Sequence, residues 1–510
     1  QAMTEPLPTA RDLAPYADLS GKPLLTAWMG GESVSRGVET LNSAGIATFS
    51  YPDEAARAFA LMWRYSANLE ALYETPPLSP AAQSGSSDAR ATAETIISQA
   101  LEAGRELLTE DEAKRLLAAY DIPTVPTRVA LDEESAVRDA REIGFPIVLK
   151  LFSYTITHKT DVGGVKLNLK DEAAVREAFR AIQSGVSAQD FDGVTVQPMI
   201  KLDGYEIIIG SSLDAQFGPV LLFGTGGQLV EVFKDRALAL PPLSTTLARR
   251  LMAGTKIYEA LQGVRGREPV ALAALEAILV RFSQLVTELP RIKEIDINPL
   301  LASPERLLAL DARVVLHPAS VADADLPHPA IRPYPAQYAS ETQLKNGTAI
   351  SIRPIRPEDE PLLRQFHETL SETSVYGRYL QPLGLGARVA HERLRRVCLG
   401  DYDREIALVA QSRAADGPPQ IVGVGRLSKV CGAGDENTGR FALLISDAVQ
   451  KQGLGTELLR QLVEVARAEG LTRLSASTLP DNNGIQATCR KLGFEVVTTA
   501  DGRVELSLGL

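Results

Sequence analysis

Apolar residues recur along the chain with two spacings, one typical of helices and the other of strands. The helical spacing predicts helices over 33–44, 110–119, 171–182, 271–287, 358–370 and 483–491, and others that begin at Asp53 and Gly455. Short apolar runs predict strands at KPLLTAWM, IATFSY, FPIVLK, VKLNL, VTVQPM, YEIIIG, PVLLF, IKEIDINPLL, LLALDA, REIALVAQ, QIVGVGRL, RFALLIS and SASTL, and near residue 503. The mixture of both elements predicts an α/β chain.

Two segments rich in proline and small polar residues divide this pattern into three parts. They lie at 76–92 and 317–345, and we interpret both as linkers. The expected domains are therefore residues 1–75, 93–316 and 346–510, which suits a chain of 510 residues. Residues 1–75 read β-α-β-α, and two strands make a poor sheet, so this part is predicted to be the C-terminal half of a doubly wound subdomain.

Composition and charge narrow the class of protein. With 45% hydrophobic and 23% charged residues the sequence is that of an ordinary globular protein, and a formal charge of -11 disfavours nucleic acid as a partner. No apolar run approaches the ~18 residues of a membrane span, and no secretory signal is readable, so we expect a cytoplasmic protein that does not cross a membrane. The cysteines lack metal-binding spacing.

The predicted strand FPIVLK ends in a lysine and is followed by a glycine-containing loop. Lys150 ends that strand, and the loop behind it contains His158, Lys159 and the pair Gly163–Gly164. A lysine charge and closely approaching backbone N–H groups suit polyphosphate. The alternative is a solvated lysine beside a plain glycine turn.

Oxygen-bearing side chains gather on the predicted strand IKEIDINPLL. Glu294, Asp296 and Asn298 alternate with isoleucines and so share one strand face, and Asp311 follows in the next apolar strand. Oxygen ligands on adjacent strands suit Mg²⁺. The alternative is a strand with one hydrated polar face.

At this point several ordered motifs resemble a known family. FPIVLK, HKTDVGGV, GPVLLFGTGG, DRALALPPL, LQGVRGREP and EIDINPLLA with LDAR are similar to the ATP-grasp subunit of ADP-forming acyl-CoA synthetases. Residues 22–73 resemble the final, flavodoxin-like subdomain of the partner subunit, as in succinyl-CoA synthetase. The resemblance implies that the family's CoA-binding domain would precede residue 1. We therefore expect an N-terminally truncated relative that does not run the complete synthetase relay.

The same resemblance implies roles for individual residues in binding ATP or ADP with Mg²⁺. It assigns Lys150 to the phosphates, the stretch from Gln197 to Met199 to the adenine hinge, Glu206 to the nucleoside, and Asn298 and Asp311 to the metal. His158 matches the histidine that carries phosphate in these synthetases.

The third part contains a glycine-containing loop at a predicted helix start. It includes Gln450, Gly453, Gly455 and Thr456, and free N–H groups at a helix N-terminus can bind a diphosphate. The alternative is an ordinary helix entry. About thirty residues later Asn482 precedes a helix ending in Gly-Phe. The pair resembles the GNAT acetyltransferase fold, which implies acetyl-CoA as cofactor, with its pyrophosphate at the first loop and its pantetheine arm near Asn482.

The order of parts resembles the bacterial Pat-type protein lysine acetyltransferases. This implies transfer of acetyl from acetyl-CoA to a lysine of a target protein, usually acetyl-CoA synthetase, with a non-catalytic, regulatory synthetase-like region; homo-oligomerisation stays open. Where that family has a glutamate base this chain has Arg440, which cannot accept a proton. Asp435 and Glu436, a few residues earlier in a glycine-containing loop, are the expected catalytic bases, and a chain of water molecules is the alternative. Cys489 stands where many GNAT enzymes have a tyrosine acid, and we interpret it as a packed structural thiol.

Two other functions remain compatible with the sequence. One is an acyl-CoA- and nucleotide-sensing module with degenerate GNAT chemistry, and the other is a fragment of an ADP-forming acyl-CoA synthetase. Incubation with labelled acetyl-CoA and an acetyl-CoA synthetase separates the enzyme from the sensor.

Overall fold

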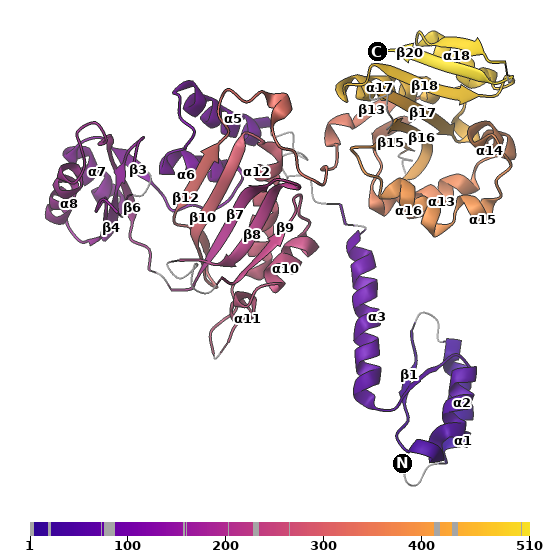
Figure 1. The fold of residues 1–510 in the computed structure, drawn as a ribbon, viewed down its shortest axis with the longest axis horizontal. Helices are drawn as coiled ribbons and strands as arrows, with labels where there is room; N and C mark the ends of the chain where they lie inside the picture. The colour runs from indigo at the N-terminus through magenta and orange to yellow at the C-terminus, as the bar shows by residue number, and fades with distance from the viewer. Residues whose placement is uncertain are drawn as a thin grey trace. The chain divides into compact units, whose positions relative to one another are not determined.

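The computed structural model shows an α/β protein in two compact units, Gln1–Glu74 and Thr75–Leu510, each described here by itself (Figure 1). It describes residues 5–18, 22–72, 74–75, 87–156, 159, 161–201, 203–227, 234–264, 266–412, 419–430, 437–500 and 502–510. Within those ranges no helix is both long and apolar enough to cross a membrane. The predicted fold class is confirmed.

The N-terminal unit is a small two-stranded arrangement with helices. Its elements are α1 (Pro6–Leu13), β1 (Leu25–Ala27), α2 (Ser35–Ser43), β2 (Ala47–Phe49) and α3 (Pro52–Leu72). β1 and β2 pair in parallel, and the ring of Trp28 packs against a core of Ala10, Leu41 and Ile46. Trp63 on α3 is 66% exposed. The predicted start of α3 at Asp53 is wrong by one residue, because proline is well tolerated in a first helical turn.

The second unit begins with the ATP-grasp-like region, which contains two sheets. Its helices are α5 (Ser87–Glu102), α6 (Glu110–Ala119), α7 (Glu133–Ile143), α8 (Glu172–Ser184), α10 (Thr245–Ala253), α11 (Ile257–Leu261) and α12 (Leu272–Glu288). Its strands are β3 (Arg128–Ala130), β4 (Ile147–Phe152), β5 (Val165–Leu169), β6 (Gly193–Pro198), β7 (Tyr205–Asp214), β8 (Gly218–Thr225), β9 (Arg236–Ala239), β10 (Ile292–Ala302), β11 (Leu307–Ala309) and β12 (Ala312–Leu316). The helix α5 begins inside the segment 76–92 that was expected to be a linker.

The two sheets of this region have separate cores. One sheet has the order β3-β6-β4-β5 and carries α7 and α8 (Figure 1), with Leu149 and Phe179 among its buried residues. The other has the order β11-β10-β7-β8-β9, with β12 also paired to β10. Thr109 caps α6 through a capping box with Glu112, which fixes where that helix begins. The start of α6 therefore has a defined position beside β12.

The C-terminal region is a mixed sheet of order β13-β14-β15-β16-β17-β18-β20-β19. Its strands are β13 (Ser340–Gln343), β14 (Ala349–Pro354), β15 (Glu405–Ser412), β16 (Gln420–Lys429), β17 (Thr438–Ile445), β18 (Arg473–Thr478), β19 (Glu495–Thr498) and β20 (Val504–Gly509). Its helices are α13 (Glu360–Glu368), α14 (Glu372–Tyr379), α15 (Leu385–Arg388), α16 (His391–Cys398), α17 (Leu454–Ala468) and α18 (Asn483–Lys491). The strand β13 lies inside the expected linker 317–345, because its backbone pairs with β14.

Strand alternation directs two helical layers to opposite faces of this sheet. On β15, Ile406 and Leu408 belong to the core beneath α17 and α18, whereas Ala407 and Val409 belong to the core beneath α13 and α16. The parallel pairing of β17 with β18 stops at Arg440 and Ser475, although both strands continue beyond those residues. The backbone edges of the two strands are therefore unpaired toward each other from residues 441 and 476 onward.

Candidate functional site

A buried carboxylate organises the polar residues of the ATP-grasp-like region. Glu110, the first residue of α6, has a side chain only 2% exposed, and its oxygens bind the Nζ atoms of Lys114 at 2.7 Å, Lys150 at 2.8 Å and Lys159 at 2.6 Å. The amide Nε2 of Gln197 donates to the same carboxylate at 2.6 Å. Lys150 and Gln197, predicted from distant motifs, are thus brought together.

The charges of this cluster do not balance. Burial alone would raise the pKa of Glu110, but Lys150, Lys114 and Lys159 hold it well below the usual range, so the group is ionised. A second carboxylate, Asp311, lies 3.8 Å from Lys150 and is about half exposed. Three ammonium groups against two carboxylates leave a net positive site, which suits the phosphates of a nucleotide.

The two predicted magnesium ligands are neighbours. The backbone N–H of Asn298 donates to the carbonyl oxygen of Asp311 at 3.3 Å, and the side-chain Oδ1 of Asn298 accepts from the N–H of Gly227 at 2.9 Å. Glu206 lies at the same glycine, since a Cβ added to Gly227 would sit 1.8 Å from its Oε2. Contacts therefore connect Glu206, Asn298, Asp311 and the Glu110 cluster in one series. Met199 is fixed by its backbone N–H, which donates to the carbonyl of Pro146 at 2.9 Å.

The oxygen atoms that face this series fit Mg²⁺ only together with a nucleotide. Glu294 and Asp296, which share the strand face of Asn298, are turned to Arg313 on β12 at 3.6 and 3.9 Å. Among the described residues no group of three or more acidic, histidine or cysteine side chains could hold a metal by itself. Mg²⁺ is commonly held by one or two protein oxygens plus substrate phosphates, and Asn298 with Asp311 offers that set.

The loop before α17 has the geometry of an anion site. Gly453, the N-cap of α17, has φ +96°, a left-handed conformation that favours glycine, and nothing lies within 4 Å of a Cβ built there. A Cβ on Gly455 would meet only Ile445, at 3.9 Å. The space over both glycines is therefore open to a ligand, next to the free N–H groups of the first turn, where Thr456 lies.

The helix α14 fixes this loop and the Asn482 segment. The side-chain amide of Gln450 donates to Ser374 Oγ at 3.0 Å and to the carbonyl of Ile445 at 3.3 Å, so its side chain anchors the loop. Asn482 directly precedes α18. Its side-chain Nδ2 lies 3.4 Å from the position that a Cβ would take on Gly377 of α14. The helix α14 therefore anchors the loop through Ser374 and lies close to Asn482.

Three of the predicted site residues lie outside the described part of the chain, and Cys489 is buried in a core. Asp435, Glu436 and His158 lie outside the described residues. Arg440 is an exposed residue of β17, at the last paired position before β17 and β18 separate. Burial raises the pKa of Cys489 to about 12, and this thiol is fully enclosed in the core beneath α17, which agrees with a structural role.

Sequence reasoning missed Glu110 and Lys114, together with a group of arginines in the C-terminal region. The two α6 residues lie four apart on a predicted helix, and that spacing was the available signal. Their burial depends on β4 and β12, which are distant in sequence. The arginines come from the helices α14 and α16 and from the strand β16, so no single linear motif contains all of them.

Comparison with known proteins assigns both regions. Residues 99–316 match an ATP-grasp domain and residues 350–495 match an acetyltransferase (GNAT) domain. The beta subunit of an ADP-forming acetate–CoA ligase from Pyrococcus furiosus is 42% identical over 233 residues, 45% of this chain and 100% of the relative. An acetyltransferase of Pseudomonas aeruginosa is 30% identical over 151 residues, 30% of this chain and 77% of the relative.

The chain belongs to the ADP-forming acetate–CoA ligase family through its ATP-grasp region, and it fuses that region to a GNAT acetyltransferase domain. A further ADP-forming acetate–CoA ligase, from Archaeoglobus fulgidus, is 36% identical over 302 residues, 58% of this chain. The chain spans only 42% of the length of that relative.

Proposed function

We propose that this protein is a Pat-type protein lysine N-acetyltransferase whose synthetase-like region is regulatory. The observation that carries the proposal is the open loop at Gly453 and Gly455, which follows the strand β17, whose pairing with β18 stops at Arg440. A helix N-terminus there can hold the diphosphate of acetyl-CoA, and the unpaired strand edges can receive its pantetheine arm. The order of the two regions resembles that of Pat-type acetyltransferases, and this resemblance is our reason for proposing acetyl-CoA synthetase as the protein target.

The chemistry requires a neutral amine. Acetyl-CoA supplies a thioester carbonyl, which the lysine nitrogen attacks; the C–N bond forms, the C–S bond breaks, and CoA leaves as the thiol. A free lysine has a pKa of ~10.4, so it must lose its proton first. We propose Asp435 and Glu436 as the acceptors of that proton, because they precede β17 in sequence, close to the position of Arg440.

We also propose that the ATP-grasp region binds ATP or ADP with Mg²⁺. Lys150 and the lysines around Glu110 would hold the phosphates, Asn298 and Asp311 would hold the metal, and Gln197, Met199 and Glu206 would border the nucleoside. Binding of a nucleotide, without synthesis of acyl-CoA, fits a regulatory role.

The test incubates the full chain with labelled acetyl-CoA and acetyl-CoA synthetase. We expect label on the synthetase, lost in Gly455→Glu, which places a carboxylate over the open loop. Glu436→Gln or Asp435→Asn should lower kcat at neutral pH, with a smaller loss at high pH, if that residue is the base. Binding of acetyl-CoA without any transfer would instead make the protein a sensor.

A further inference from the structure

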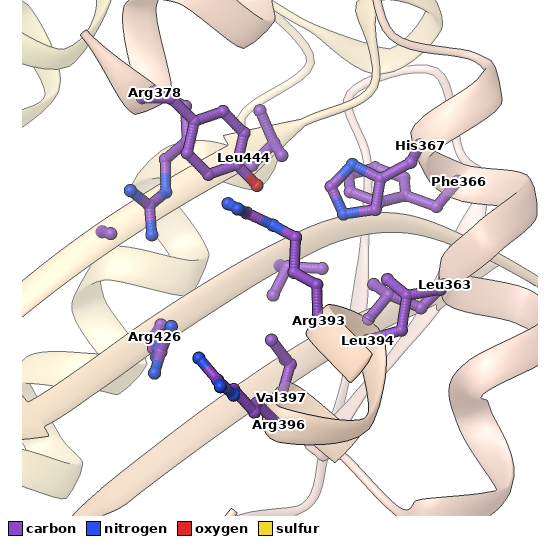
Figure 2. Close-up of a pocket in the computed structure, with 13 residues that line it drawn as sticks. Leu363, Phe366, His367, Arg378, Arg393, Leu394, Arg396, Val397, Arg426 and Leu444 are labelled. Atoms are coloured by element: carbon purple, nitrogen blue, oxygen red, sulfur yellow. The ribbon is translucent and has the colours of Figure 1, made fainter. Parts of the chain in front are cut away.

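A second cavity of the C-terminal region lies on the face opposite to α17. It encloses about 320 Å³ between α13, α14, α16 and the strands β16 and β17 (Figure 2). Figure 2 shows Arg378 and Arg426 on one side of this pocket, Leu363 and Phe366 on the other, and Arg393 between them. The arginines are Arg378, Arg393, Arg396 and Arg426, and the apolar wall includes Leu363, Phe366 and Leu394.

The arginines of this pocket are short of counter-charge. Arg426 pairs with Glu405, whereas Arg378, Arg393 and Arg396 form no ion pair with any described residue. Two of them lie over the ring of Tyr379, with the guanidinium carbon of Arg378 at 5.1 Å and that of Arg393 at 4.7 Å from its centroid. The two guanidinium groups are therefore both held against one aromatic ring of the pocket wall.

Burial strengthens the demand for an anion. Burial is the main cause that lowers the pKa of Arg378; Tyr379 opposes this shift, and the nearby charges of Arg426 and Arg393 add to it. The Nε atom of Arg426 is buried and has no hydrogen-bond partner among the described residues. A bound carboxylate would relieve both costs, since it pairs with guanidinium groups in a two-bond geometry.

The pocket shares its walls with the acetyl-CoA loop. The helix α14 carries Ser374, which holds Gln450 of that loop, and one turn later Arg378 and Tyr379, which line the pocket. The strand β17 lines the pocket with Ala442 and Leu444 and ends just before the same loop. By strand alternation Arg440 lies on this face too. The pocket is therefore beside the expected position of the thioester.

We propose that this pocket binds the acceptor, and that it selects a lysine flanked by an aspartate or glutamate. The acidic side chain would pair with Arg393 and Arg396, while the apolar wall at Phe366 would cover the aliphatic part of the peptide. This inference rests on the proposed acetyltransferase function and names its substrate class.

The test uses the full chain and two lysine peptides of equal length, one with aspartates beside the lysine and one with asparagines. We expect the aspartate peptide to be acetylated with at least a tenfold higher kcat/KM. Arg393→Gln and Arg396→Gln should each raise KM for the aspartate peptide about tenfold and leave KM for acetyl-CoA unchanged. Arg395→Gln is the matched control, because it is exposed on the same helix and does not line the pocket.

Three outcomes overturn the inference. The first is an equal kcat/KM of the wild-type chain for the two peptides. The second is an equal change in KM for the aspartate peptide in the Arg395 and Arg393 variants. The third is a rise in KM for acetyl-CoA alone, which would assign the arginines to the cofactor. Fluorescence anisotropy of the labelled peptides separates this inference from the proposed function. Aspartate-dependent binding without transfer would support the pocket and sink the acetyltransferase, whereas transfer without a preference for aspartate would do the reverse.

Discussion

The carboxylate of Glu110 should be the most sensitive point of the ATP-grasp region to substitution. The variant Glu110→Gln keeps the shape of the side chain but removes the charge that three lysines share, among them Lys114, which is only 3% exposed. Breaking a buried ion pair by removing one partner costs ~3–5 kcal/mol. For a region of this size, ~1 kcal/mol moves Tm by roughly 2–4 °C, so we expect its transition to fall by roughly 6–20 °C.

Differential scanning calorimetry is the appropriate assay, because it resolves the transitions of separate domains in one chain. Glu94→Gln is the control: it removes an exposed ion pair with Arg90, which contributes only ~0–1 kcal/mol. If Glu110→Gln lowers the transition temperature no more than this control does, the buried carboxylate does not stabilise the lysine cluster, and the role that we give to Glu110 is wrong.

The pH dependence of stability tests whether the ionised form of Glu110 stabilises the folded state. Burial opposes ionisation of Glu110, but Lys150, Lys114 and Lys159 lower its pKa in the folded state below the unfolded value of about 4.3. A group with a lowered folded pKa adds stability above its unfolded pKa, and this stability is lost as the pH falls through the folded pKa. The wild type and Glu110→Gln should therefore differ fully at pH 7 and converge in strong acid.

Three further outcomes are expected. Gly453→Ala, which forces a side chain to φ +96°, should cost ~1 kcal/mol and weaken acetyl-CoA binding in calorimetry. Gly455→Ala, inside α17, should not lower Tm and should still weaken binding. Full affinity in both variants would contradict the loop assignment. Asn298→Ala should abolish thermal stabilisation by Mg-ADP, and persistence of that stabilisation would remove Asn298 from the site. Burial, and then Arg388, lower the pKa of His367 to about 4, so thermal melts should show stability falling between pH 6.5 and 4, a fall that is absent in His367→Gln.

Secondary structure was predicted well from the sequence where residues close together in the chain determine it. The helix over 110–119 was predicted to the residue, because Thr109 and Glu112 form a capping box and the apolar spacing is regular. Many central strands, such as β7, β8, β10, β15 and β16, were predicted as short apolar runs between turns, whereas β9, β12, β13 and β19 were not predicted. The segment that forms α14–α16 was missed beyond residue 370, because these helices are short and their apolar stripes are narrow.

The polar sites were predicted only in part. Motifs predicted Lys150, Asn298 and Asp311 as site residues. Each motif covers one stretch of the chain, however, and does not show which distant residues contact it in the folded protein. Lys159 and Glu110 are 49 residues apart, and only the packing of α6 against the sheets makes them neighbours. The arginine pocket combines three helices and two strands, so its charge excess exists only in the folded chain.

The two tryptophans of the sequence, Trp28 and Trp63, both belong to the N-terminal unit. Trp28 packs against the small core there, and Trp63 is already largely in contact with water. The tryptophan emission of this protein is therefore an intrinsic spectroscopic label for one unit, and its change on denaturation reports mainly the surroundings of Trp28. A tryptophan introduced beside the acetyl-CoA loop would add a direct optical signal for the GNAT domain.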